Sequence, residues 1–330
     1  MLRKRSIALA IGLAAALALP ALTPVLASYP GATNGRLAFG QRLADGSSNI
    51  FSANADGTGL NQLTHGAHNH LCPSYSADGQ NIAYCSDVTG AWEIWAMKQN
   101  GTKQHQVTHL GGFSTFPDYS PDGKKIAFVG QIGTDPSDQV YVVNASNGGG
   151  LVQLTTCPVV DGFCFNDYPV WSPNGRKIAY IHGEQFDADG NPLDEQVWVM
   201  NADGSHKTQL TFDAPFKDQV PDWSPDGTKI AYASGLSGIW VMNADGSNQH
   251  QLTGCTAADP VPCATGDDFG PAWSPDGRKI AFLRDFRSIG GNSRPVYVMN
   301  ADGTGQHQLV PGTRVNMVPT WQARGAGAGS

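Results

Sequence analysis

The chain has 330 residues, with 28 acidic and 21 basic side chains and a formal net charge of −7. An acidic chain without a basic cluster is a poor partner for nucleic acid or for an anionic membrane surface, so neither is expected as a ligand. Length alone would favour two domains, but the internal repeats described below indicate a single repeat array instead.

The N-terminus has the pattern of a secretory signal. Basic residues at 3–5 precede an apolar run from Ile7 to Leu19, and small residues occupy the cleavage positions around Ala27. The alternative is a membrane anchor, but the run is short and Pro20 and Pro24 interrupt it. We therefore predict that residues 1–27 are removed and that no membrane span remains. The mature protein, with a formal charge of −10 after loss of three basic residues, would be periplasmic or secreted.

A short segment, residues 28–33, leads into six copies of one apolar triplet. The copies lie about 44 to 52 residues apart, a spacing typical of propeller blades. The triplets are Leu37-Ala38-Phe39, Ile82-Ala83-Tyr84, Ile126-Ala127-Phe128, Ile178-Ala179-Tyr180, Ile230-Ala231-Tyr232 and Ile280-Ala281-Phe282.

A second repeated feature is an aromatic residue two positions after a proline. Its six copies are Tyr75, Tyr119, Trp171, Trp223, Trp273 and Trp321. The two series are out of phase, because the first triplet has no aromatic before it and the last aromatic has no triplet after it. The C-terminal strand is therefore predicted to complete the N-terminal blade and close a ring.

One complete repeat, residues 220–253, shows the expected strands. They are Val220–Ser224, Lys229–Ala233, Gly238–Asn243 and Gln249–Thr253. Asp-Gly pairs between them supply the positive φ that tight turns need. We predict an all-β, six-bladed β-propeller of four-stranded blades over residues 34–322, followed by a disordered tail, residues 323–330.

The repeat unit resembles that of the TolB β-propeller family. The shared pattern is Pro-x-Trp-Ser-Pro-Asp-Gly-x-Lys-Ile-Ala-Phe/Tyr, then Val-Met-Asn-Ala-Asp-Gly-Ser/Thr, then Gln-Leu-Thr. The resemblance covers residues 34–322 and implies the WD40-like six-bladed fold. It also implies a protein partner within the cell envelope. It says less about function, because propellers include both binding proteins and enzymes.

Six cysteines suit an exported protein, in which disulfides persist. Cys72 and Cys85 face each other across one hairpin, and the other four share two loops in pairs. The predicted bridges are Cys72–Cys85, Cys157–Cys164 and Cys255–Cys263. Free thiols or a metal cluster are the alternative, although no Cys-x-x-Cys occurs.

Polar residues recur three positions before each strand-one proline, where we expect them to surround the channel mouth. With their acidic neighbours they form a candidate ligand-binding set, unless they are polar only because the channel is wet. The set is His70, Ser114, Asn166, Asp167, Asp218, Asp267, Asp268 and Asn316.

Two groups have the composition of metal sites. His65, His68 and His70 would suit a transition metal, with solvated loop histidines as the alternative. Asp187, Asp189 and Asn191 resemble part of a calcium loop, although turn chemistry explains them equally well. A divalent cation, calcium or a transition metal, is thus the only cofactor that the sequence suggests.

We predict a monomeric, non-enzymatic protein that binds a protein, peptide or glycan. The binding surface would be the channel mouth and the face that carries the long loops 156–168, 183–195 and 254–270. The alternative is a metal-dependent lyase or hydrolase that acts in the channel through the histidines and the acidic residues. No Gly-x-Ser-x-Gly, His-Glu-x-x-His or phosphate-loop motif occurs.

Overall fold

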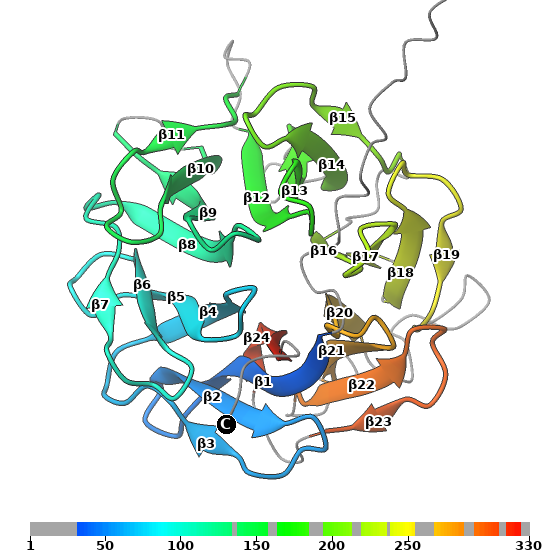
Figure 1. Ribbon diagram of the computed structural model, residues 1–330, viewed down its shortest axis with the longest axis horizontal. Helices are drawn as coiled ribbons and strands as arrows, with labels where there is room; N and C mark the ends of the chain where they lie inside the picture. The colour runs from blue at the N-terminus through cyan, green and yellow to red at the C-terminus, as the bar shows by residue number, and fades with distance from the viewer. Residues whose placement is uncertain are drawn as a thin grey trace, which may run out of the picture.

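The computed structural model consists of six four-stranded antiparallel sheets arranged in a ring, so the predicted six-bladed β-propeller is confirmed (Figure 1). The structure describes residues 32–133, 137–157, 164–184, 194–212, 219–235, 238–254, 267–286, 294–309 and 315–324, apart from the side chain of Asn316. The predicted signal sequence, residues 1–27, lies outside this range. Within the described residues, no helix is long and apolar enough to cross a membrane.

Each blade is a meander, and its strands run from the channel outward. Blade one is β24 (Val315–Arg324), β1 (Thr33–Arg42), β2 (Ser48–Asn54) and β3 (Asn61–Gln62). Blade two is β4 (His70–Tyr75), β5 (Asn81–Ser86), β6 (Glu93–Lys98) and β7 (His105–Gln106). Blade three is β8 (Phe113–Tyr119), β9 (Lys125–Gln131), β10 (Gln139–Asn144) and β11 (Val152–Gln153).

The remaining blades repeat this order. Blade four is β12 (Phe165–Trp171), β13 (Lys177–Gly183), β14 (Gln196–Asn201) and β15 (Thr208–Gln209). Blade five is β16 (Gln219–Trp223), β17 (Lys229–Ser234), β18 (Gly238–Asn243) and β19 (His250–Gln251). Blade six is β20 (Asp267–Trp273), β21 (Lys279–Asp285), β22 (Val296–Asn300) and β23 (His307–Gln308).

Ring closure occurs as predicted, because β24 pairs with β1 and supplies the inner strand of blade one. The predicted boundary at residue 322 is two residues too early. Ala323 and Arg324 still pair with Asn34 and Thr33, so they belong to the sheet rather than to a tail. Gln322 extends the closure to blade two, since its amide donates to the Gly79 carbonyl at 2.9 Å.

The hydrophobic core lies between neighbouring blades. Ile50 of blade one, for example, packs in one buried cluster with Tyr75, Ile82 and Met97 of blade two. Apolar side chains on both faces of each sheet are therefore buried, and each blade depends on its neighbours for most of its core.

The Asp-Gly turns between strands one and two and between strands three and four lie on one face of the ring, here called the turn face. In these turns the aspartate caps the backbone two residues ahead. Asp226 accepts from the Thr228 N–H at 3.0 Å, and Gly227 has φ of 69°. The loops between strands two and three and between blades lie on the opposite face, here called the loop face.

Two of the three predicted disulfides are confirmed. Cys72–Cys85 joins β4 to β5, and Cys157–Cys164 closes a loop between blades three and four. Cys255 and Cys263 lie outside the described residues, so the third bridge stays a prediction.

Candidate functional site

The innermost strands of all six blades surround a central pocket of about 170 Å³. Each strand contributes a proline to its wall, and an edge strand tolerates this residue because its outer side needs no hydrogen-bond donor. These prolines are Pro73, Pro117, Pro169, Pro221, Pro271 and Pro319. A second tier, from the Ser-Pro turns, extends the wall to the turn face, namely Pro121, Pro173, Pro225 and Pro275.

A β-bulge includes each proline and changes which side chains face the pocket. In blade two, Leu71 pairs with Cys85 but Ser74 pairs with Ala83, so strand one carries one extra residue. In blades two to six the residue before the proline has a left-handed backbone, with φ of 48° at both Phe116 and Tyr168. Those two rings contact each other at 4.2 Å between centroids and line the pocket on the side nearer the loop face.

Asp118, one residue after its proline, faces the pocket and bridges three blades. Its carboxylate accepts from the Ser74 hydroxyl of blade two at 2.9 Å and from the Trp171 N–H of blade four at 2.8 Å. Burial raises the pKa of Asp118 to about 6, and these two hydrogen bonds limit the rise.

Asp222 holds the same position in blade five but has fewer partners in the neighbouring blades, and each of the two aspartates also accepts from the N–H of the residue that follows it. Its Oδ2 accepts from the Trp273 N–H of blade six at 2.6 Å. On the blade four side its neighbour is Val170, which has no hydroxyl to donate. Burial, together with the charge of Asp118, raises the pKa of Asp222 to about 8.

Asp118 and Asp222 were not among the site residues predicted from the sequence. The sequence feature that could have identified them is their position directly after a strand-one proline. The residues at this position are Ser74, Asp118, Val170, Asp222, Ala272 and Thr320, and all of them line the pocket.

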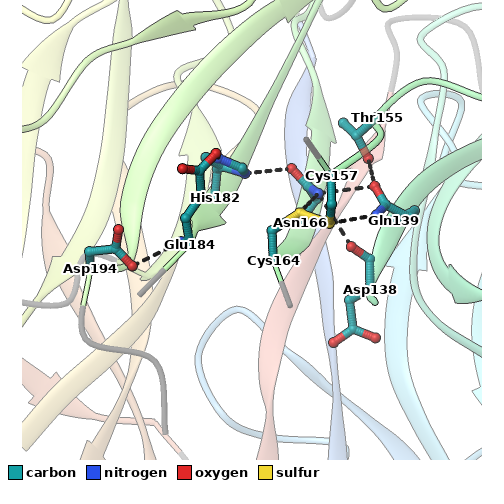
Figure 2. Close-up of polar contacts among 9 residues, drawn as sticks. All are labelled: Asp138, Gln139, Thr155, Cys157, Cys164, Asn166, His182, Glu184 and Asp194. Carbon is teal, nitrogen blue, oxygen red and sulfur yellow. Dashed lines mark hydrogen bonds and ion pairs between the residues drawn. A yellow bond between two sulfur atoms is a disulfide. The ribbon is translucent and has the colours of Figure 1, made fainter. Parts of the chain in front are cut away.

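The residues predicted to surround the channel mouth do not form one ring. Asn166 lies between blades three and four, and its side-chain amide donates to Gln139 Oε1 at 3.1 Å (Figure 2). Its Oδ1 lies 2.9 Å from His182 Nδ1, and His182 Nε2 lies 3.2 Å from Glu184. Both sulfurs of the Cys157–Cys164 bridge also contact this network.

Asp268 makes a different contact, in the equivalent seam between blades five and six. Arg284 donates to both of its carboxylate oxygens, at 2.7 and 2.8 Å. Burial nevertheless raises the pKa of Asp268, and the hydrogen bonds and charge of Arg284 oppose that rise. Asp267 and Asp268 also line a second pocket, of about 380 Å³, together with Gln219 and Arg294.

The other predicted members are dispersed. His70 is buried with its ring edge against Tyr84, and Ser114 is buried in blade three. Asp167 accepts from the Tyr168 N–H at 2.8 Å, and burial followed by the charge of Asp138 raises its pKa to about 8. Asp218 and the side chain of Asn316 lie outside the described residues.

The histidines predicted to hold a transition metal do not converge. His65 and His68 are exposed, whereas His70 is buried, and burial lowers the pKa of His70. No three His, Cys, Asp or Glu side chains of the described ranges are arranged to hold a metal ion. The predicted calcium ligands Asp187, Asp189 and Asn191 fall in the undescribed stretch 185–193.

Six blades, a ring closed by the C-terminal strand and a central pocket define the protein as a six-bladed β-propeller. Residues 30–191 match the PD40 family, the TolB β-propeller domain. TolB from Acinetobacter baumannii has a similar structure, with a TM-score of 0.69 at 20% identity over 89% of this chain and 68% of TolB. The chain thus has a TolB-like β-propeller fold.

Two further similarities extend the comparison. An uncharacterized protein of Agrobacterium fabrum, Atu1656, is 31% identical over 56% of this chain and 46% of its own length. The chain spans less than half the length of the two curated relatives that it matches. An oligogalacturonate lyase solved with manganese has a TM-score of 0.54 at 18% identity, covering 86% of this chain and 77% of the lyase.

Proposed function

We propose that this protein is a non-enzymatic binding protein of the periplasm or the extracellular space, and that a segment of a protein or peptide partner enters its central pocket. The observation that carries the proposal is the pocket itself, whose wall comes from the inner strands of all six blades. A concave site with apolar and aromatic walls and few polar groups is typical of ligand binding.

Three further features support this proposal. The two disulfides suit an oxidising compartment, as does the signal pattern of residues 1–27. The TolB-like fold is consistent with a protein partner. The turn-face prolines border the pocket, so the turn face is the entrance that we favour. The loop face stays a second candidate surface for a protein, peptide or glycan, because most of its long loops are outside the described residues.

Photo-crosslinking would test the proposal and locate the binding face. A photoreactive residue would replace Lys124 beside the turn-face entrance, His68 on the loop face, or His105 on the outer rim. All three residues are exposed. We expect an envelope or secreted protein to crosslink at position 124, with excess unlabelled wild-type protein competing.

Position 105 on the outer rim is the control for crosslinks that form by random collision. Crosslinking at position 68 alone would move the binding site to the loop face. Equal crosslinking at all three positions, or none at any of them, would contradict a specific partner site.

A further inference from the structure

We propose that the central pocket binds a primary ammonium group, and that Asp222 is the carboxylate that receives it. This inference rests on the proposed function and gives the chemistry of the inserted segment. Its starting point is an incomplete hydrogen-bond pattern. Asp118 accepts hydrogen bonds from both neighbouring blades. Among its neighbouring blades, Asp222 accepts a hydrogen bond from blade six alone, on Oδ2. A donor brought by a ligand would complete the pattern.

The charge of the pocket wall favours a cation. The described lining residues include Asp118 and Asp222 but no lysine, arginine or histidine. Two carboxyl groups thus share an enclosed space without a counter-charge from the wall. A positive ligand group would be attracted to both, and more strongly than in open water because the surrounding protein has a low dielectric.

The remaining wall suits an organic cation. Aromatic residues contribute to the wall, and among them the rings of Phe116 and Tyr168 contact each other on the side nearer the loop face. The rings of the six repeated aromatics, Tyr75, Tyr119, Trp171, Trp223, Trp273 and Trp321, pack in the buried clusters between blades behind this wall. Aromatic faces attract ammonium groups, and prolines offer no N–H that would compete for the carboxylates. A volume of about 170 Å³ is roughly that of five or six water molecules, enough for the five non-hydrogen atoms at the end of a lysine side chain.

Other cations fit this pocket less well. A guanidinium group pairs best with two oxygens of one carboxylate, but only one oxygen of Asp222 lacks a donor from another blade. A metal ion needs several ligands in one place, and the described residues contain no group of three metal-binding side chains. An ammonium group needs only one strong acceptor and tolerates aromatic neighbours. The ammonium group would come from a lysine of a protein partner or from a free small amine.

Binding of a cation at Asp222 should depend on pH, because the cation competes with a proton. The pKa of Asp222 is raised to about 8, so the carboxyl group must lose its proton to bind below that pH. Affinity should fall about tenfold for each pH unit below pH 8 and level off above it. The other titratable lining groups are Asp118, Tyr75, Tyr119 and Tyr168. The pKa of Asp118 is about 6, and burial raises the pKa of each tyrosine.

Calorimetric titration with n-butylammonium chloride would test the proposal on the full mature chain. We expect a dissociation constant of about 1 mM at pH 9, an order of magnitude set by the small size of the probe. The constant should be about tenfold weaker at pH 7. Neutral n-butanol should bind at least tenfold more weakly at pH 9.

Two matched substitutions separate the site from general charge effects. Asp222→Asn should weaken binding at least tenfold and remove its pH dependence. Asp245→Asn, the same change on an outer turn where blade two already has Asn100, should bind as the wild type does. Thermal melting of both variants would show that they are folded. Unchanged binding by folded Asp222→Asn, or no binding by wild type at pH 9, would overturn the proposal.

Competition and peptide measurements identify the natural source of the group. Displacement of the probe by millimolar potassium or calcium would show a site for inorganic cations and would also overturn the proposal. Binding of acetyl-Ala-Lys-Ala-amide, but not of its norleucine analogue, would assign the site to a lysine of a partner. Binding of free amines alone would assign it to a small metabolite. Crosslinking at Lys124 with no butylammonium binding would refute the ammonium chemistry while leaving the binding function intact.

Discussion

Asp118 in blade three and Asp222 in blade five occupy the same position one residue after a strand-one proline, yet their environments differ. Asp118 has donors on both sides, from Ser74 and Trp171, and its pKa is about 6. Asp222 has Val170 where Asp118 has Ser74, and its pKa is about 8. One hydroxyl in the adjacent blade thus helps to determine whether a pocket carboxyl group is charged near neutral pH.

The same comparison explains why a repeated fold does not give repeated chemistry. The six blades share a backbone, but each pocket side chain meets the side chains of two different neighbours. Asp118 mainly joins blades two, three and four through its hydrogen bonds, whereas Asp222 retains an acceptor for a ligand. A carboxyl group that joins blades and one that binds a ligand should respond differently to substitution.

The largest expected effect is on stability. Asp118→Ala leaves the Ser74 hydroxyl and the Trp171 N–H without partners, which should lower the free energy of unfolding by about 2–4 kcal/mol. Asp222→Ala removes one such bond and should cost about 1 kcal/mol. Urea denaturation at about pH 4, where the raised pKa values leave both carboxyl groups protonated in the folded protein, followed by tryptophan fluorescence, would measure both losses without the cost of ionisation. Equal losses of unfolding free energy in the two variants would contradict the distinction between a carboxyl group that joins blades and one that binds a ligand.

The next effect concerns the pH dependence of stability. The folded-state pKa of Asp222 is raised from 3.8 to about 8, so its contribution to stability is full below about pH 4 and is lost as the pH rises to 8. Between these values the group should lower the free energy of unfolding by at most about 1.4 kcal/mol per pH unit. Asp167 should behave similarly, because its pKa is also about 8.

Asp222→Asn should therefore flatten the fall in stability between pH 6 and pH 8, and Asp167→Asn provides the comparison on the loop side of the pocket. Denaturation midpoints at several pH values would measure the slopes. A slope that is unchanged in Asp222→Asn would show that this carboxyl group is already ionised in the folded protein at pH 6.

The smallest expected effect is on the pKa values of the two aspartates, and it tests the role of the hydroxyl in the adjacent blade. Val170→Ser would give Asp222 the hydroxyl that Ser74 gives Asp118, and we expect its pKa to fall by about one unit. Ser74→Ala should raise the pKa of Asp118 by a similar amount. Carbon-13 NMR titration of the two carboxyl groups would measure both changes. If neither pKa moves, the Asp118 charge rather than the missing hydroxyl separates the two residues.

Much of the architecture followed from local sequence patterns. The apolar triplets predicted the second strand of every blade, and the offset of the aromatics predicted closure by the C-terminal strand. Two disulfides followed from positions within one hairpin and one loop. These features depend on residues close together in the sequence or on the repeat itself, so they need no knowledge of how the blades pack.

The site could not be predicted in the same way, because only the folded ring decides which side chains share a space. Simple strand alternation would place His70 and Ser74 on the same side of blade two. The bulge pairs His70 with Ser86 but Ser74 with Ala83, which reverses the alternation between them. Hence His70 and its counterpart Asn166 are buried within and between blades, while Ser74 and its counterparts line the pocket. The sequence by itself determined six blades and their order. The tertiary structure decided which carboxyl groups meet, because one extra residue per inner strand reverses the side to which the later side chains point.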